Sequence, residues 1–317
     1  MRPYVVAVGS AVVDEYYACD SWPAIGDKAM ARHVGNAVGG MVPNAASVMS
    51  GFDMQVYLLD RLGDDADTHM ILQDLQHHGI RTDYVEIDAS SRNSKTLIVL
   101  TEGERTILVV DDPDRKPLRL DDERVELLLG AQFVYTLIPT LRSLPGLREA
   151  IVRAQAGCAR LVLDVESASF ADREADRDSF ELADVICFNE RAFEKYSAGI
   201  GKDWAFERLL DRDDKLVAVT LGAQGCLVRT VRQEIRIPGI PVTPVDTTGA
   251  GDTFIASLMY GLSQNWELQR TAAFANAAAA RSVLAVGPKA GIAPAAEIEA
   301  WGGRALDECQ TYRSCRN

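Results

Sequence analysis

Apolar runs rich in β-branched residues alternate with helix-like segments along most of the chain, and this alternation limits the fold more than any other feature. The runs occupy residues 4–9, 54–63, 132–138, 160–165, 183–189 and 215–222. Patterns typical of helices follow several of them, at residues 65–78, at residues 141–156 and from Glu190 onward. Near-continuous apolar strands separated by helices are typical of a parallel sheet that is covered on both faces. Right-handed crossovers then predict an α/β domain with a doubly wound, mostly parallel sheet.

Two segments depart from this rhythm, because neither has a helix between its strands. Residues 12–34 contain an alternating stretch followed by Pro23 and Gly26, and residues 94–110 read as two strands around a Glu-Gly-Glu turn. We expect both to form a small antiparallel sheet that extends from the main domain. The predicted division is a core of residues 1–11, 35–93 and 111–300, a β lid of residues 12–34 and 94–110, and a C-terminal tail of residues 301–317.

The composition excludes several classes of function. The chain has 33 Lys and Arg against 46 Asp and Glu, a net charge of −13, which disfavours nucleic acids and anionic membranes as partners. A local site can still bind an anion despite the negative charge of the protein as a whole. No apolar run approaches the ~20 residues that span a bilayer, and the first ten residues do not resemble a signal peptide. The cytoplasm is therefore the expected location.

The cysteines and histidines show no pattern typical of a metal site. None of the 6 cysteines forms a CxxC pair, and most lie inside apolar runs. Buried free thiols are the interpretation that this placement favours over a zinc site or a disulfide framework. The 4 histidines lack ligand spacing as well.

Small and polar residues recur where the predicted strands end. They are Gly9 and Ser10 with Asp14 beyond them, Asp164 and Glu166, Asn189 and Glu190, and residues 220–222. In open α/β sheets, ligands bind at the carboxyl ends of the strands. We therefore expect the functional site at this edge of the sheet.

The stretch "VDTTGAGDTF", residues 245–254, has the features of an anion site. Gly249, Ala250 and Gly251 form a loop that enters a helix, and the first N–H groups of a helix lack internal partners and carry the positive end of its dipole. Asp252 would lie at the mouth of this site, where a carboxylate can act as a general base. The alternative is that Asp252 only caps the helix, since Asp is a favoured capping residue.

Two motifs together resemble those of the ribokinase-like (PfkB) carbohydrate kinase family. "VDTTGAGDTF" is similar to the family's C-terminal pattern D-T-x-G-A-G-D, and "VGGMVPNAASVMSGF", residues 38–52, is similar to its N-terminal motif. They occur in the expected order, and the resemblance extends from Tyr4 to Pro294. The chain has no Walker A sequence, so it does not read as a P-loop kinase.

The resemblance implies a ribokinase-like fold and ATP-dependent phosphorylation of a hydroxyl on a sugar or sugar-like molecule. It assigns the catalytic base to Asp252 and the anion hole for the transferred phosphoryl group to Gly249, Ala250 and Gly251. It assigns sugar binding to Asp14, Gly39, Gly40 and Asn44. Carboxylate and amide groups suit hydroxyl ligands. The alternatives are a tight turn for the two glycines and a helix cap for Asn44.

The implied nucleotide and cation sites lie later in the chain. Thr220, Gly222 and Gly225 resemble the family's nucleotide-contacting turn. Asn276 lies in an Ala-rich segment that would leave room for a base, although close helix packing explains the alanines equally well. Residues 244–248 and 285–291 resemble the segments that hold a monovalent cation such as K⁺ in some family members. Asp246 and Thr248 would hold it through their side-chain or carbonyl oxygens.

The chain departs from the family pattern at two positions. Many members carry the motif N-x-x-E. This chain has its Asn at Asn189, which is predicted to contact the nucleotide, but Ala192 stands at the position of the Glu. Glu190 or Glu194 would then organise Mg²⁺ through water, or the phosphates would hold the metal. Ribokinases also tend to have Glu before Ile-Pro, where this chain has Leu137. That difference argues against strict specificity for ribose.

Three further expectations concern the lid. Arg105, at its turn, is predicted to reach an anionic part of the substrate or product, and the alternative is an exposed hairpin arginine. The resemblance implies a homodimer formed through the lid. A nucleoside kinase on the same fold is an alternative, kept open by Tyr16, Tyr17 and Trp22. A catalytically silent sugar-binding protein is another, although the intact GAGD sequence argues against it.

Overall fold

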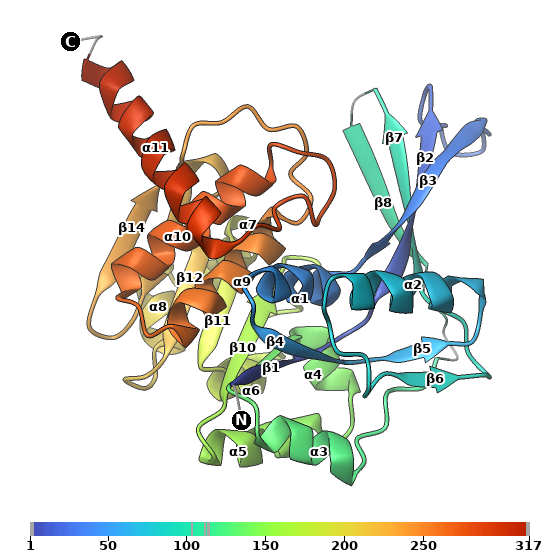
Figure 1. Cartoon of the computed structure of the whole chain (residues 1–317), viewed down its shortest axis with the longest axis horizontal. Coiled ribbons are helices and arrows are strands. Elements are labelled where there is room, and N and C mark those ends of the chain that lie inside the picture. The colour runs from blue at the N-terminus through green and yellow to red at the C-terminus, as the bar shows by residue number, and fades with distance from the viewer. Residues whose placement is uncertain (1–2, 103, 111, 113–114, 315–317) are drawn as a thin grey trace.

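The computed structural model describes residues 3–102, 104–110, 112 and 115–314, and it contains one large sheet and a smaller one (Figure 1). The large sheet has eight strands in the order β14-β13-β12-β11-β10-β9-β1-β4. Its strands are β1 (Tyr4–Val8), β4 (Gln55–Leu59), β9 (Phe133–Leu137), β10 (Arg160–Val165), β11 (Val185–Asn189), β12 (Leu216–Thr220), β13 (Gly225–Arg229) and β14 (Glu234–Pro238). Every predicted core strand is present.

The strands from β4 to β12 pair in parallel, and the edge strands β13 and β14 pair antiparallel. The sequence reading did not include these two edge strands. The α/β class with a mostly parallel sheet is confirmed. The alternating side chains of the buried strands fill two apolar cores, one on each face of the sheet.

Helices cover both faces. One core is closed by α1 (Met41–Gly51), α2 (Ala66–His77), α9 (Ala250–Ser263), α10 (Leu268–Ser282) and α11 (Ala295–Ser314). The other is closed by α3 (Asp122–Leu129), α4 (Ile138–Ser143), α5 (Leu147–Ala156), α6 (Arg177–Leu182), α7 (Glu190–Ser197) and α8 (Lys202–Leu209). None of the helices in the described ranges is both long enough and apolar enough to cross a membrane.

The smaller sheet projects from the core above α1 and α2 (Figure 1). It consists of β2 (Val12–Cys19), β3 (Ala31–Gly39), β7 (Lys95–Thr101) and β8 (Glu104–Val110), in the order β3-β2-β7-β8. The prediction of an antiparallel sheet is wrong for the central pair, because β2 and β7 run parallel. β2 and β3 are consecutive in one segment, and β7 and β8 are consecutive in the other. β2 and β7 belong to different segments, so no hairpin dictates their direction. β3 also extends beyond residue 34, to Gly39.

Several local expectations need correction. The helix expected at residues 141–156 is two helices, because Pro145 and the left-handed Gly146 separate α4 from α5. The predicted boundary at residue 300 falls inside α11. Cys158 is exposed, whereas Cys19, Cys187 and Cys226 are buried free thiols as expected. Gly103 of the predicted lid turn and Cys315 lie outside the described residues.

The remaining elements are short. β5 (Arg61–Gly63) and β6 (Glu86–Asp88) form a two-stranded parallel sheet, and η1 (Gly222–Gln224) is a single turn of 3₁₀-helix between β12 and β13.

Candidate active site

The N-terminus of α9 is built as an open backbone surface. Gly249, the residue before the helix, has a left-handed φ of 76°, and a β-carbon there would collide with Pro288. Gly251 is different, because a β-carbon there would have no atom within 4 Å. No side chain caps the helix, and within the described residues the N–H groups of Gly251 and Asp252 have no acceptor. Unpaired donors at the positive end of a helix dipole favour an anion.

Asp252 lies in the first turn of this helix and is only 7% exposed. Its Oδ2 accepts a hydrogen bond of 3.0 Å from Nδ2 of Asn44 on α1. Burial raises the pKa of Asp252 well above its usual value, the charges of Asp164 and Glu166 raise it further, and the Asn44 bond partly offsets the shift. Asp252 does not cap its helix, so the capping alternative is wrong. A carboxylate with a raised pKa is a suitable proton acceptor.

Asn44 joins this carboxylate to the turn between β3 and α1. Its backbone N–H donates to the carbonyl of Gly40, and its Oδ1 is buried with no partner among the described residues. An unpaired buried acceptor is costly unless a ligand supplies a donor. A hydroxyl placed between Asn44 and Asp252 would supply one. The capping alternative for Asn44 is wrong, because Gly40 is the residue that precedes α1.

Gly39 and Gly40 are glycines for steric reasons. A β-carbon on Gly39 would overlap the carboxylate of Asp14, and one on Gly40 would lie 2.5 Å from the carbonyl oxygen of Ser10. Gly40 also has a φ of 106°, which side chains rarely adopt. Close contacts thus explain why both positions are glycine, and their part in sugar binding stays a prediction. The missing side chain at Gly39 lets the carboxylate of Asp14 lie close to the backbone just before α1.

Asp14 is 8% exposed and projects from β2. Burial raises its pKa, while a hydrogen bond from Thr96 and the charge of Lys289 lower it in part. Asp14, Gly39, Gly40, Asn44 and Asp252 therefore come together, although they are widely separated in the sequence. The arrangement offers several carboxylate and amide groups to a polyhydroxylated ligand.

Asp164 and Glu166 add negative charge at the end of β10. Burial, followed by the charge of Glu166, raises the pKa of Asp164 to about 7, and burial raises the pKa of Glu166. The hydroxyl of Tyr135 on β9 donates to Asp164 Oδ2 over 3.2 Å. The sequence analysis placed both acids at a strand end but missed Tyr135. The spacing of Tyr135 and Leu137 could have identified it, because residues two apart in a strand have their side chains on the same face of β9.

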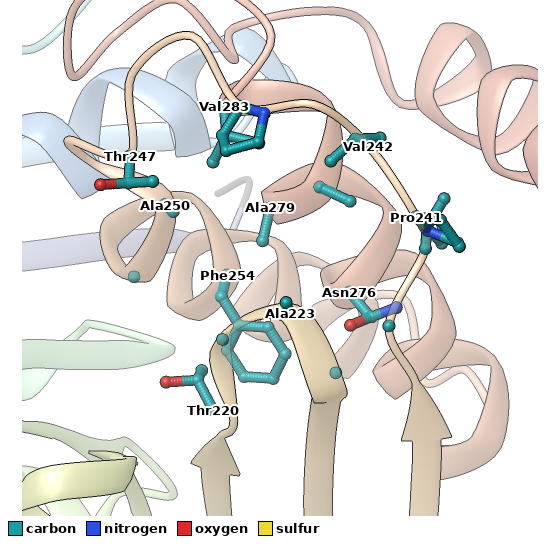
Figure 2. A pocket seen from close by; sticks show the side chains of 17 residues that line it. Thr220, Ala223, Pro241, Val242, Thr247, Ala250, Phe254, Asn276, Ala279 and Val283 are labelled. Atoms are coloured by element: carbon teal, nitrogen blue, oxygen red, sulfur yellow. The ribbon is translucent and has the colours of Figure 1, made fainter.

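A largely apolar cavity of about 300 Å³ lies beside the open end of α9 (Figure 2). Its walls come from the ends of strands on one side and from α9 and α10 on the other. Four predicted nucleotide-contacting residues line it, and so do two residues of the open turn of α9. They are Thr220, Gly222, Gly225, Asn276, Ala250 and Gly251. The sequence analysis missed Phe254, Pro241 and Val283, because apolar side chains carry no signal that separates a cavity from a core.

The structure also shows what holds the polar residues of this region. Asn276 donates to the carbonyl of Pro238 over 3.1 Å, which leaves its Oδ1 available beside the cavity. Asn189 pairs with Thr220 in the sheet, and its Oδ1 accepts from the N–H of Ala192 over 2.8 Å. Asn189 therefore caps α7, and Ala192 is fully buried behind it. Glu190 begins α7 and does not line the cavity.

Asp246 and Thr248 lie in the loop that leads into α9. Burial alone would raise the pKa of Asp246, but hydrogen bonds from Thr248 and Gly287 and the charge of Arg105 together lower it. The contact with Gly287 joins the two segments that resemble a cation site. Arg105 reaches this loop from the lid and contacts Asp246 and Thr248.

Comparisons with known proteins identify the family and the fold. The model of the pfkB family carbohydrate kinases matches residues 2–296. The chain is 27% identical over 302 residues to the ribokinase of Bacillus subtilis (strain 168), covering 93% of this chain and 98% of that protein. It is 27% identical over 279 residues to the ATP-dependent ribose-1-phosphate kinase of Halopiger xanaduensis, covering 87% and 90%. The solved ribokinase of Arabidopsis thaliana, complexed with ribose and ATP, has a TM-score of 0.80 at 22% identity, covering 95% and 99%.

An open α/β sheet with a buried carboxylate beside the unpaired N–H groups of a helix N-terminus is an arrangement suited to phosphoryl transfer between small molecules. The family match is specific, and the chain belongs to the pfkB family of carbohydrate kinases. Its ribokinase-like fold and its class of activity, ATP-dependent phosphorylation of a sugar or sugar-like molecule, are confirmed. The roles of the individual residues stay predictions.

Proposed function

We propose that the protein transfers the γ-phosphoryl group of ATP to a hydroxyl held between Asp252 and Asn44. The observation that carries this proposal is the position of α9. Its first turn lines the apolar cavity through Ala250 and Gly251 and also presents Asp252 to the Asn44 side. A nucleotide in the cavity and a polyol beside Asn44 would therefore meet at the same helix terminus.

The chemistry follows from this geometry. Asp252 takes the proton of the acceptor hydroxyl as the oxygen attacks the γ-phosphorus in line. The free N–H groups of Gly251 and Asp252 face the charge that develops on the transferred group. The apolar cavity, with Asn276 at its wall, is suited to the adenine ring.

The residues present fit a Mg²⁺ ion that is held mainly by nucleotide phosphates. Mg²⁺ prefers oxygen ligands and commonly uses one or two carboxylates beside the phosphates. Asp164 and Glu166 supply such oxygens near Asp252, and burial is the main cause that raises the pKa of both carboxyl groups. When bound, the ion neutralises phosphate charge. Glu190, which begins α7, would contribute only through water.

We assign to the smaller sheet the role of a lid. β2 brings Asp14 to the substrate side, and Arg105 on β8 contacts the loop before α9. Closure over the acceptor would exclude water and so limit hydrolysis of ATP. The division of the chain into core and lid is part of this proposal, as is the cytoplasmic location.

A substrate screen tests the proposed function. ADP release would be measured with ATP, Mg²⁺ and a panel of pentoses, hexoses, keto-acid sugars and nucleosides, with and without K⁺. We expect turnover with at least one polyol and none without an acceptor. Binding of sugars without any turnover would instead support the silent sugar-binding alternative.

Leu137 leads to a prediction about the acceptor. It ends β9 on the face that carries Tyr135 and pairs with Asp164, so it lies toward the site. We expect ribose not to be the best substrate, since Leu137 cannot accept from a sugar hydroxyl. Leu137→Glu should raise kcat/KM for ribose about tenfold or more, because a hydrogen bond to a charged group contributes about 1.5–3 kcal/mol.

Steady-state kinetics on the wild type, Leu137→Glu and the uncharged control Leu137→Gln would check this. The idea fails if ribose is clearly the best substrate of the wild type and Leu137→Glu brings no gain for ribose.

A nucleoside is the second candidate acceptor, and one aromatic residue favours it. Tyr16 lies on the same face of β2 as Asp14 and is half-buried. Burial is the main cause that raises the pKa of Tyr16, and the charge of Asp14 raises it further. Its ring could stack on a base. Tyr17 points to the other face, where its hydroxyl donates to Glu15 over 2.8 Å, and Trp22 is 50% exposed beyond the strand. Of the three aromatic residues, Tyr16 alone supports this alternative.

The lid also supports the proposed homodimer. β8 is an edge strand, and its apolar side chains Ile107, Leu108, Val109 and Val110 are all exposed. Edges and apolar patches of this kind favour association with another chain. We expect the wild type to have the mass of a dimer in light scattering and the double variant Leu108→Asp/Val110→Asp to be monomeric. Val152→Asp, at an exposed apolar position on α5, is the matched control and should stay dimeric. A monomeric wild type would contradict the proposal.

A further inference from the structure

One side chain of the lid connects it to the loop that precedes the anion hole. Nη1 of Arg105 lies 3.4 Å from Oδ1 of Asp246 and also donates to Oγ1 of Thr248. These are the two residues whose sequence context resembles a monovalent cation site. The guanidinium therefore reaches the acceptors that such an ion would use.

The carboxylate of Asp246 has little capacity left for an ion. Oδ1 accepts from the N–H of Thr248 at 2.9 Å and from its hydroxyl at 2.6 Å, in addition to Arg105. Oδ2 accepts from the N–H of Gly287 at 2.9 Å. Each carboxylate oxygen offers about two lone-pair sites, so the three donors leave no free site on Oδ1, while Oδ2 keeps one. K⁺ at Oδ1 or at the Thr248 hydroxyl would have to displace Arg105, so these two side-chain oxygens do not fit the ion in this arrangement.

We propose that Arg105 supplies the positive charge at this loop in place of a monovalent cation and acts as a positioning residue for the N-terminus of α9. The inference rests on the proposed kinase function. A guanidinium is permanently charged and is tethered to the chain, so it needs no ion from solution. It holds the loop that continues into Gly249 and thereby the orientation of the free N–H groups after it.

The position of Arg105 couples this effect to the lid. Arg105 pairs with Leu100 of β7, so the two side chains lie on the same face of the lid. Ile98 shares that face and pairs with Tyr16 of β2. Because Tyr16 and Asp14 alternate along β2, Arg105 lies on the lid face that carries Asp14. The same face therefore carries Asp14, which is proposed to bind the acceptor, and Arg105, which contacts the loop before α9. The charge reaches Asp246 only while the lid lies over the site.

A comparison of K⁺ responses tests the proposal. Phosphorylation rates of the wild type, Arg105→Ala and Arg105→Lys would be measured across a KCl titration, with ionic strength held constant by N-methylglucamine chloride. Arg32→Ala, at an exposed arginine on the lid strand β3, is the matched control. The Tm of each protein in KCl and in N-methylglucamine chloride provides a readout that is independent of activity.

We expect the wild type, the Arg32→Ala control and the charge-retaining Arg105→Lys variant to be insensitive to K⁺ in both readouts. Without K⁺, Arg105→Ala should lose about tenfold to a hundredfold in kcat, as expected when a group near the chemistry is misplaced. K⁺ should restore much of this loss and raise the Tm of Arg105→Ala alone, because the ion can then occupy the freed acceptors.

Three results would overturn the inference. One is activation and thermal stabilisation of the wild type by K⁺. Another is an Arg105→Ala variant with unchanged kinetics and no response to K⁺. The third is an increase in the KM for the acceptor alone without a K⁺ response, which would make Arg105 a substrate contact. If no acceptor is phosphorylated, the proposed function fails, and the Tm measurements still decide the role of Arg105.

Discussion

Asp252→Asn is expected to lower kcat by about 10²–10⁴-fold while the fold and the affinity for ATP stay unchanged, because this is the contribution of a positioned general base. Asn has the shape of Asp and keeps an oxygen that can accept from Asn44, whose Nδ2 lies 3.0 Å from Oδ2 in the wild type. It cannot take a proton from the acceptor hydroxyl. Single-turnover kinetics and ATP binding by calorimetry would measure the two effects separately.

Asp164→Asn is the informative comparison for this variant. Burial is the main cause of the raised pKa of Asp252, and the charge of Asp164 raises it further. Removing that charge should lower the pKa of the base, so the acid limb of the kcat/KM profile should move to lower pH.

An Asp252→Asn variant with turnover near that of the wild type would remove Asp252 from the mechanism.

Gly251→Val is expected to lower kcat by about 10²-fold or more, the order of losing one oxyanion donor. The physical reason is obstruction of the phosphoryl group. A β-carbon at Gly251 meets no protein atom within 4 Å, so the fold accepts a side chain, but this residue lines the cavity where the nucleotide is proposed to bind. Kinetics and thermal unfolding of the variant should therefore show lost turnover with little change in Tm.

Gly303→Val is the matched control, since Gly303 on α11 also has no atom within 4 Å of an added β-carbon and lies outside the cavity. It should keep full activity. Unchanged turnover in Gly251→Val, together with a lower Tm, would show that Gly251 is needed only for the structure.

The sequence by itself determined the class of fold and most of the candidate site. Strand formation depends on local apolar runs such as residues 160–165. These runs can be recognised in the sequence without knowing which strand pairs with them. The loop into α9 was equally legible, because its glycines allow a close backbone approach to a ligand at the positive end of the helix, next to Asp252. The split of the helix at residues 141–156 was also visible in principle, at Pro145 and Gly146, but the apolar periodicity on either side obscured it.

Only the tertiary structure decided which of these residues meet. Asn44 and Asp252 are joined by a hydrogen bond across 208 residues, and Tyr135 reaches Asp164 from the neighbouring strand. A local pattern shows where a strand ends, but it does not show which strand lies beside it. The same reason explains why the parallel pairing of β2 with β7 was not expected.

The contact between Arg105 and Asp246 is the strongest case. In the sequence, Arg105 is one arginine at a hairpin turn and Asp246 is one acidic residue in a loop, and each has an ordinary explanation alone. The lid brings them together across 141 residues. The sequence alone therefore determined which chemical groups the site contains, because local patterns specify residue types and strand ends. The tertiary structure decided which group compensates which charge, because that depends on distances between segments that the chain order does not fix.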